Sequence, residues 1–283
     1  MRAGIIGCGY LGWRIARKLL SSREIPLVVT RSTEKAATLR AAGIDVALGD
    51  VGRGPVEALG SVDGLIIALG FDRTAREGPA ELRLRVLEHL AASLPRARRV
   101  IYVSTTGVYG AASGRLDERS EARPVRAGAV AHWEAEERLR TGPWQGVTTC
   151  LRLGGLYGPG RLPEAARLRA AEPIERDGDH WLNLIHVDDA ARVVSAQWDA
   201  APERACLVVT DGAAVMRKVF YGEMARVHGW PAPRFAPQLD AARRADTPAR
   251  RTVRSRWFAQ DVAPHIEFAD YREGLRDIAR RIG

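Results

Sequence analysis

The first twenty residues, MRAGIIGCGYLGWRIARKLL (1–20), decide the fold. Residues 4–6 predict the end of a short buried strand, and residues 13–20 predict a helix. Three glycines with the spacing GxGxxG stand between these two elements, at Gly7, Gly9 and Gly12. A strand, a glycine turn and a helix in this order are typical of a dinucleotide-binding site.

Each of the three glycines has its own role in such a site. Gly7 permits the tight turn, Gly9 lets the backbone come close to a pyrophosphate, and Gly12 lets the helix pack on the strand. The helix N-terminus offers free N–H groups and a positive dipole end to the phosphates. We therefore predict a nucleotide site rather than a glycine turn without function. The residues between Gly9 and Gly12 are predicted to contact the cofactor as well, namely Tyr10 and Leu11.

The bulk composition is that of an ordinary globular chain. The 283 residues are 46% hydrophobic and 27% charged, and no apolar run approaches the ~20 residues that span a bilayer. Glycines and basic residues interrupt the N-terminal apolar stretch, which therefore lacks a signal-peptide pattern. The cysteines are too few and too scattered for a disulfide framework or a metal site, at Cys8, Cys150 and Cys206. We expect a cytoplasmic protein that has no membrane contact and holds no metal.

The chain is strongly basic, with a formal net charge of +9 and a sequence pI of about 10.1. Such a field favours anionic ligands and also nucleic acid. Because no nucleic-acid motif accompanies the charge, we favour a solvated basic surface over a nucleic-acid partner. The densest basic patch, Arg243–Arg256, is either part of an anionic substrate pocket or a plain surface, and both interpretations stay open.

Strands alternate with helices through the first hundred residues. Further strands are predicted at 26–30, 44–48, 63–69 and 99–103. This alternation predicts an α/β fold with a doubly wound parallel Rossmann sheet. Ligands of such a sheet lie at the carboxyl ends of its strands. The predicted cofactor contacts at these ends are Asp50, Ala68, Leu69, Gly70 and Ser104.

The second strand decides which dinucleotide is expected, because it leads into Thr30-Arg31-Ser32. A site that prefers NAD places Asp or Glu at this point to accept from the ribose 2′-OH. A guanidinium and two hydroxyls suit a 2′-phosphate instead. We therefore predict NADP as the cofactor, with NAD as the alternative if Arg31 is only one of many surface arginines.

Three later segments carry a family resemblance. STTGVYG (104–110) resembles the S-[ST]-x-x-V-Y-G segment of the extended short-chain dehydrogenase/reductase superfamily, the NAD(P)-dependent epimerase/dehydratase proteins. CLRLGGLYGPGR (150–161) resembles the LRxxxxYGPGR of that family. LNLIHVDDA (182–190) resembles its xNxIHVDDxA. The motifs follow in the order and spacing of the family, so the resemblance covers essentially the whole chain.

The resemblance implies how the chain is divided. A Rossmann domain is expected over residues 1–158, and residues 182–212 return to it with a strand at 205–209. A smaller C-terminal substrate domain is expected mainly over residues 159–283. Family members often form dimers through a four-helix interface, which implies a homodimer built from helices near Pro79–Ser93 and Ala129–Arg140.

The resemblance also implies a chemistry on a small-molecule substrate. Hydride passes to or from the nicotinamide, assisted by a Ser or Thr, by a Tyr that acts as general acid/base, and by a Lys that lowers the pKa of this Tyr and binds the nicotinamide ribose. By its position, Thr105 takes the Ser/Thr role beside Ser104. The alternative for Thr105 is a purely structural cap at the end of its strand.

The family pattern Y-x-x-x-K is missing, because no tyrosine of this chain has a lysine four residues later. Alignment of the helix near residues 129–140 puts Gly128 at the Tyr position and His132 at the Lys position. His132 then becomes a candidate acid/base or ribose contact, and Tyr109 becomes a candidate phenol. The alternative for His132 is a half-exposed helix residue without a catalytic role.

The second half supplies the candidates for substrate binding. Arg161 is placed to reach a phosphate or carboxylate, and Asn183 is a candidate substrate contact. His186 and Asp189 are expected to hold a loop and a helix start in place. Leu182 stands near the point where sugar-nucleotide enzymes of the family often carry an Arg that holds a diphosphate, which disfavours a nucleotide-sugar substrate.

Two functions of different classes follow from these patterns. The first is an NADP-dependent oxidoreductase or epimerase that acts on an anionic or sugar-like substrate. The second is a regulatory or sensor protein that binds NADP and has lost catalysis together with the Tyr–Lys pair. The segment around Thr105 and Tyr109 favours the first function, and the missing pair favours the second.

Overall fold

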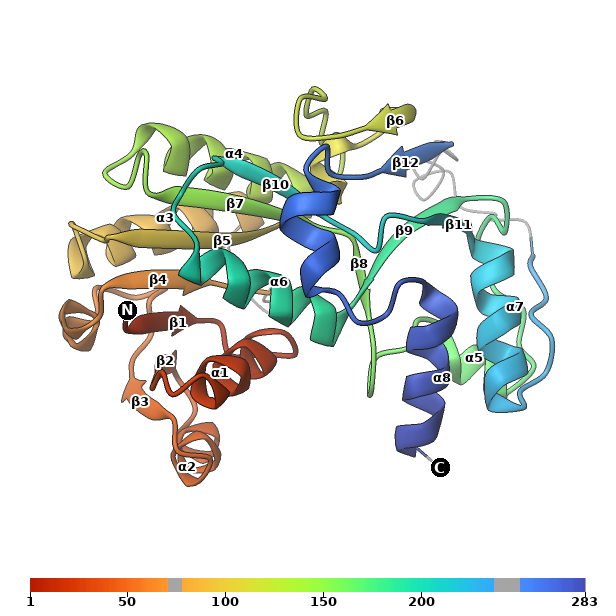
Figure 1. Ribbon diagram of the computed structural model, residues 1–283, viewed down its shortest axis with the longest axis horizontal. Coiled ribbons are helices and arrows are strands. Elements are labelled where there is room, and N and C mark those ends of the chain that lie inside the picture. Colours follow the sequence, from red (N-terminus) through yellow and green to blue (C-terminus); the bar gives the residue numbers. More distant parts are fainter. Residues whose placement is uncertain (71–77, 237–249, 283) are drawn as a thin grey trace.

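The computed structural model describes residues 1–70, 78–236 and 250–282. Its centre is a parallel sheet of seven strands in the order β10-β7-β5-β4-β1-β2-β3 (Figure 1). In chain order the strands are β1 (Ala3–Ile6), β2 (Leu27–Thr30), β3 (Asp45–Leu48), β4 (Gly64–Ile67), β5 (Arg99–Thr105), β7 (Thr148–Leu153) and β10 (Cys206–Val209). The predicted doubly wound α/β fold is therefore confirmed.

Helices cover both faces of this sheet, which is why its strands are almost continuously apolar. One face packs against α1 (Gly12–Ser21), α2 (Thr33–Ala41) and α6 (Val187–Asp199), and the other packs against α3 (Pro79–Ser93) and α4 (Ala127–Thr141) (Figure 1). Alternate residues of each strand serve the two faces. Ile5 lies in the core with α1, whereas its neighbour Ile6 lies in the core with α3.

The strand predicted at 205–209 does return to the sheet, because β10 pairs in parallel with β7. Two strands between β7 and β10, joined by one strand after β10, form a second, three-stranded sheet in the order β11-β9-β8. Its strands are β8 (Gly155–Tyr157), β9 (Trp181–His186) and β11 (Ala214–Met216). A two-stranded sheet joins β6 (Gly114–Leu116) to β12 (Arg251–Val253).

The remaining helices gather around the three-stranded sheet at one end of the molecule (Figure 1). They are α5 (Ala165–Arg169), α7 (Arg217–His228) and α8 (Tyr271–Ile282). Their apolar side chains form a separate core around Tyr157, Phe220 and Leu275. Short helical turns complete the chain, at η1 (Glu57–Ser61), η2 (Thr106–Tyr109), η4 (Phe258–Val262) and η5 (Ala263–His265). In the described part of the chain, every helix is too short or too polar to cross a bilayer.

Candidate functional site

The glycine turn between β1 and α1 has the geometry that its spacing predicts. Gly7 has φ +93°, and a Cβ on it would lie 2.6 Å from the Ala68 carbonyl oxygen. A Cβ on Gly12 would lie 2.2 Å from the carbonyl oxygen of Gly7. A Cβ on Gly9, by contrast, meets no atom of the described residues within 4 Å. The turn is therefore closed on the protein side and open at Gly9, so its backbone fits a pyrophosphate.

Tyr10, within this turn, has two guanidinium groups near its ring. The Arg14 guanidinium lies 4.4 Å and the Arg161 guanidinium 5.4 Å from the centre of the Tyr10 ring. Arg161, predicted as a substrate contact, thus lies next to the predicted cofactor turn, and this position gives it access to a phosphate from either ligand. Leu11 buries its side chain in the core, so a contact with a cofactor would come through its backbone.

The end of β2 brings together the residues predicted to choose the dinucleotide. The Arg31 side chain is 65% exposed, and its guanidinium lies 3.8 Å from the Asp50 carboxylate. Ser32 caps α2 by accepting a hydrogen bond from the Lys35 backbone N–H at 3.1 Å. The Thr30 hydroxyl oxygen accepts from the Ser32 backbone N–H at 3.3 Å. An exposed guanidinium therefore stands at the positive end of a helix.

Ser104, at the end of β5, belongs to a buried ionic network that the sequence did not reveal. Its hydroxyl donates a hydrogen bond to the Glu136 carboxylate. Arg152 from β7 makes an ion pair with Glu136 at 2.7 Å, and both side chains are 6% exposed. Arg152 also donates to the Tyr109 hydroxyl at 3.1 Å. The only sequence signal for the ion pair of Arg152 with Glu136 was the position of Arg152 in the CLRLGG motif segment.

The predicted catalytic residues on β5 and η2 take different positions. The Thr105 hydroxyl, half-buried, accepts from the Gly107 N–H at 3.0 Å, which leaves its own hydrogen available to donate. Tyr109 is fully buried and donates its hydrogen to the Asp117 carbonyl at 2.7 Å. Burial raises the pKa of Tyr109 well above its ordinary value. The hydroxyl hydrogen of this candidate phenol is thus engaged with the protein backbone.

His132, at the aligned Lys position, is buried with 8% exposure and is not the half-exposed residue of the alternative interpretation. Its Nδ1 lies 2.9 Å from the Tyr102 hydroxyl, which accepts from Arg83 at 3.2 Å. Because Tyr102 accepts from Arg83, its single hydroxyl hydrogen is available to Nδ1 of a neutral imidazole. Burial, followed by the Arg83 charge, lowers the pKa of His132 to about 3. Arg83 also donates to the carbonyl of Leu69, one of the predicted cofactor contacts, at 3.4 Å.

The buried imidazole predicts a loss of stability in acid. Because folding lowers the pKa of His132 from 6.5 to about 3, the unfolded state binds the proton first. The free energy of unfolding should fall as the pH drops below 6.5, by up to about 1.4 kcal/mol per pH unit for this residue. Urea denaturation from pH 8 to pH 4 tests this for the wild type and for His132→Asn. The free energy of unfolding should fall more for the wild type than for the variant. Parallel plots of this free energy against pH would contradict the lowered pKa of His132.

The side chains of Asn183, His186 and Asp189 form hydrogen bonds with other parts of the protein. The Asn183 amide donates to the Arg251 carbonyl at 3.3 Å and accepts from the Val253 N–H at 2.7 Å, so it clamps β12. Both the nitrogen and the oxygen of the Asn183 amide therefore bond to the protein, which was not expected of a residue that contacts substrate. His186 accepts from the Asp188 N–H at 3.3 Å and caps α6. Asp189 is fully buried and accepts from the backbone N–H groups of residues 267 and 268, as its predicted structural role requires.

Asp188 links the first and last helices of the chain. It accepts from Arg14 of α1 at 2.7 Å and from Arg281 of α8 at 3.0 Å. His186, Asp188 and Asp277 are close enough together to hold a metal ion. However, Arg281 also pairs with Asp277 at 2.8 Å, so guanidinium groups already neutralise both carboxylates.

A cation group, made of Arg126, Arg217 and Arg251 around the neutral His180, lies where α4, α7 and β12 begin. Burial, then Arg217 and Arg251, lowers the pKa of His180 to about 4. Burial, then Arg126, lowers the pKa of Arg251. Buried nitrogens of this group without a hydrogen-bond partner among the described residues are His180 Nδ1, Arg217 Nε and Arg251 Nε. The two Arg Nε–H groups are donors that an anion would satisfy, and His180 Nδ1 is a donor in the tautomer that carries its hydrogen there.

The described arginines of the predicted basic patch, Arg243–Arg256, thus lie in two different environments. Arg251 belongs to the cation group, whereas Arg254 and Arg256 stack on the rings of Phe258 and Trp257 at 4.4 and 5.6 Å. The first part of the patch, residues 243–249, lies outside the described residues.

Comparisons with known proteins agree with this geometry. The model of a protein family described as NAD(P)H-binding matches residues 7–199 of this chain. Protein YeeZ of Escherichia coli (strain K12) is 31% identical over 252 residues, which cover 86% of this chain and 89% of YeeZ. The chain belongs to the NAD(P)H-binding family. The extended short-chain dehydrogenase/reductase resemblance of the three motifs is confirmed.

Solved structures share the fold of this NAD(P)H-binding chain over its whole length. A functionally unknown conserved protein from Silicibacter pomeroyi DSS has a TM-score of 0.81 at 24% identity, covering 99% of this chain and 98% of its own. UDP-glucuronic acid 4-epimerase from Bacillus cereus, in complex with NAD, has a TM-score of 0.77 at 16% identity, covering 100% and 99%. Members of the epimerase/dehydratase fold therefore share this arrangement of sheet and helices.

Proposed function

We propose that this protein binds NADP(H) and uses it for hydride transfer on a small anionic substrate in the cytoplasm. The observation that carries the proposal is the exposed Arg31 guanidinium at the end of β2. When bound, the nicotinamide supplies or accepts the hydride. The open backbone at Gly9 would hold the pyrophosphate, and the end of β2 would hold the adenosine.

The 2′-phosphate of NADP is the group that Arg31 suits. Arg31 stands at the N-terminus of α2, where Ser32 caps the helix and Lys35 adds a charge in the first turn. Helix dipole, guanidinium and ammonium all favour a dianion. Asp50 lies 3.8 Å from Arg31 across an exposed surface, a distance at which a phosphate competes readily for the guanidinium.

Titration with NADPH and with NADH, followed by nicotinamide fluorescence, tests this assignment. We expect the wild type to bind NADPH more tightly, and Arg31→Ala to weaken NADPH by about 10- to 100-fold, equivalent to the loss of about 1.4–2.8 kcal/mol. NADH binding should change little, because NADH has no 2′-phosphate for Arg31 to contact.

Arg98→Ala is the matched control for this titration. Arg98 is also exposed and also lies 3.8 Å from an aspartate, Asp63, but at the opposite end of the sheet. Its removal changes the net charge by the same amount and should leave both affinities unchanged. An equal loss of NADPH affinity in the two variants would mean that Arg31 acts only through the overall positive charge of the protein.

An anionic substrate is supported by the cation group around His180, Arg217 and Arg251. Arg251 donates to the Gly110 carbonyl at the end of η2, so its Nε, which has no hydrogen-bond partner among the described residues, lies close to η2. Thr105, one residue before η2, keeps a hydroxyl hydrogen that can stabilise a substrate oxygen while hydride moves. The Bacillus cereus neighbour is named for a UDP-glucuronic acid substrate, which is itself an anion.

A second function is favoured by the state of the phenols and of His132. Tyr109 donates to a backbone carbonyl, Tyr102 is buried, and the pKa of His132 is lowered to about 3. None of these three groups is set to exchange a proton near neutral pH, which suits an NADP(H)-binding sensor. NADPH oxidation with a panel of carboxylated and phosphorylated carbonyl compounds separates the functions. Turnover that Thr105→Val abolishes supports the oxidoreductase, and tight NADPH binding without turnover supports the sensor.

A further inference from the structure

A tight turn follows β8 and lies beside the glycine turn of the predicted cofactor site. It is made of residues 158–161, Gly-Pro-Gly-Arg. The Gly158 N–H donates to the Arg161 carbonyl at 3.2 Å, and the Arg161 N–H donates to the Gly158 carbonyl at 2.9 Å. Pro159 and Gly160, which has φ +78°, take the central positions that proline and glycine favour in a type II turn. The backbone from which the Arg161 side chain starts is therefore well defined.

This turn packs directly on Tyr10. A Cβ on Gly158 would lie 2.6 Å from the Tyr10 hydroxyl oxygen, so the backbone of the turn touches that hydroxyl. The Arg161 guanidinium lies 5.4 Å from the centre of the Tyr10 ring. Tyr10 directly follows Gly9, which is exposed and is the open point of the glycine turn. Arg161 therefore stands close to the place where a pyrophosphate approaches the backbone.

The charges around Tyr10 leave Arg161 available to an anion. Helix α1 begins without a side-chain cap and without an acidic residue in its first turn, so its free N–H groups and its dipole also favour an anion here. Arg14 is already engaged, because it donates to Asp188 at 2.7 Å and to the Tyr10 carbonyl at 2.8 Å. Arg161 is exposed, and no carboxylate oxygen of the described residues lies within 4 Å of its guanidinium nitrogens.

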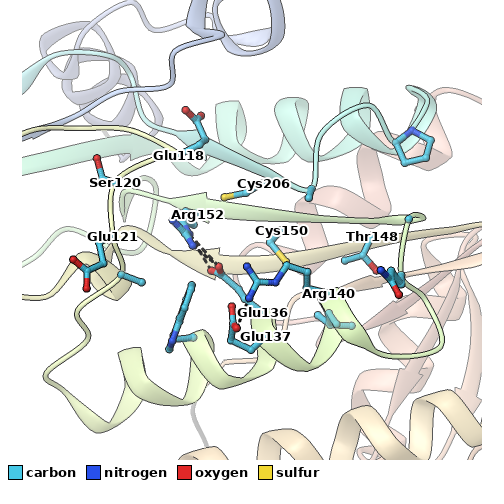
Figure 2. Close-up of a pocket in the computed structure, with 17 residues that line it drawn as sticks. Glu118, Ser120, Glu121, Glu136, Glu137, Arg140, Thr148, Cys150, Arg152 and Cys206 are labelled. Carbon is cyan, nitrogen blue, oxygen red and sulfur yellow. Dashed lines mark hydrogen bonds and ion pairs between the residues drawn. The ribbon is translucent and has the colours of Figure 1, made fainter.

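A pocket of about 650 Å³ at the β10 edge of the sheet shows the opposite situation (Figure 2). Two arginines line this pocket, and both have a carboxylate partner. Arg152 pairs with Glu136 at 2.7 Å, and Arg140 pairs with Glu137. An anion in this pocket would have to displace a carboxylate, whereas an anion beside Tyr10 meets a guanidinium whose charge is not yet balanced.

We propose that Arg161 binds the pyrophosphate of the dinucleotide cofactor, an inference that rests on the proposed cofactor site at the glycine turn. The planar guanidinium fork can pair with two phosphate oxygens at once. The glycine turn would hold the pyrophosphate through backbone N–H groups, and Arg161 would add a side-chain contact from the segment after β8. A residue of the expected substrate domain thus takes part in cofactor binding, although its motif suggested a substrate contact.

The substrate then relies on a different set of arginines. Arg251 donates to the Gly110 carbonyl at the end of η2, which follows β5, whereas Arg161 lies by Tyr10, which follows β1. Strand β4 separates β1 from β5 in the sheet, so these two strands lie about 10 Å apart. The cation group around His180 is therefore left for the anionic group of the substrate, and Arg161 for the cofactor.

Calorimetric titration of the full chain with two fragments of the cofactor tests the proposal. ADP-ribose contains the pyrophosphate and lacks the 2′-phosphate, whereas 2′-AMP contains the 2′-phosphate and lacks the pyrophosphate. We expect Arg161→Ala to weaken ADP-ribose about 10-fold and to leave 2′-AMP unchanged. Arg31→Ala should do the reverse. Arg161→Lys should keep part of the ADP-ribose affinity, because an ammonium retains the charge but not the two-pronged geometry.

Arg169→Ala is the matched control. Arg169 of α5 is also exposed, and its guanidinium also lies 5.4 Å from the centre of an aromatic ring, that of Trp230. Its removal changes the net charge equally and should leave both affinities unchanged. The inference is overturned if Arg161→Ala binds ADP-ribose as the wild type does, or if Arg169→Ala loses as much affinity. In both cases a wild type that binds NADPH leaves the proposed cofactor site standing, whereas a wild type that binds no NADPH overturns that site together with the inference.

Discussion

Replacing Glu136 with alanine is expected to lower the free energy of unfolding by about 3–5 kcal/mol. The substitution leaves the Arg152 charge buried without its counter-ion, in a place where water cannot replace it. Burial by itself works against that charge, and the hydrogen bonds of Glu136 outweigh it and raise the pKa of Arg152. Ser104 loses its acceptor at the same time. The whole network between α4, β5 and β7 is therefore affected by one change.

Glu137→Ala supplies a close comparison on the same helix. Glu137 pairs with Arg140 at the surface, where both side chains are more than a third exposed. An exposed pair of this kind contributes about 0–1 kcal/mol. Chemical denaturation of both variants at pH 7 measures the difference. Similar losses for the two variants would mean that the buried pair contributes no more than a surface pair.

Gly12→Ala and Gly9→Ala should have opposite consequences, although they lie three residues apart. The new Cβ at position 12 would lie 2.2 Å from the backbone oxygen of Gly7, and backbone cannot rotate out of its way. We expect Gly12→Ala to cost about 3 kcal/mol or more, because α1 must move away from β1. Differential scanning calorimetry should show this loss without any cofactor present.

Gly9→Ala should fold normally, since its Cβ meets no described atom within 4 Å. The added methyl instead occupies the space where a pyrophosphate approaches the backbone. Its NADPH dissociation constant should rise at least about tenfold, or about 1.4 kcal/mol, while the melting temperature stays near that of the wild type. A Gly9→Ala variant that binds NADPH normally would contradict the placement of the pyrophosphate.

The elements built from local sequence were the predictable ones. The GxGxxG spacing identified the turn between β1 and α1 because each glycine answers a local steric demand. The apolar strands were recognisable because burial on both faces leaves almost no polar positions. The end of the fifth predicted strand likewise placed Ser104 and Thr105 at the edge of the sheet where a ligand is expected.

The contacts that join distant segments were not predictable in this way. His132 was assigned by alignment on its own helix, yet its burial depends on Tyr102 of β5 and Arg83 of α3. The amide of Asn183 finds its partners on β12, 68 and 70 residues later. Such pairings depend on the relative placement of whole elements, which no periodicity within one segment encodes.

The sharing of Asp188 by the first and last helices has a consequence for how this protein can vary. One carboxylate balances Arg14 near the start of the chain and Arg281 near its end. Loss of the carboxylate would leave two guanidinium groups close together, and loss of one arginine would leave the other as its main partner. Among related sequences, positions 14, 188 and 281 are therefore expected to covary, so that the two ends of the chain evolve as one unit.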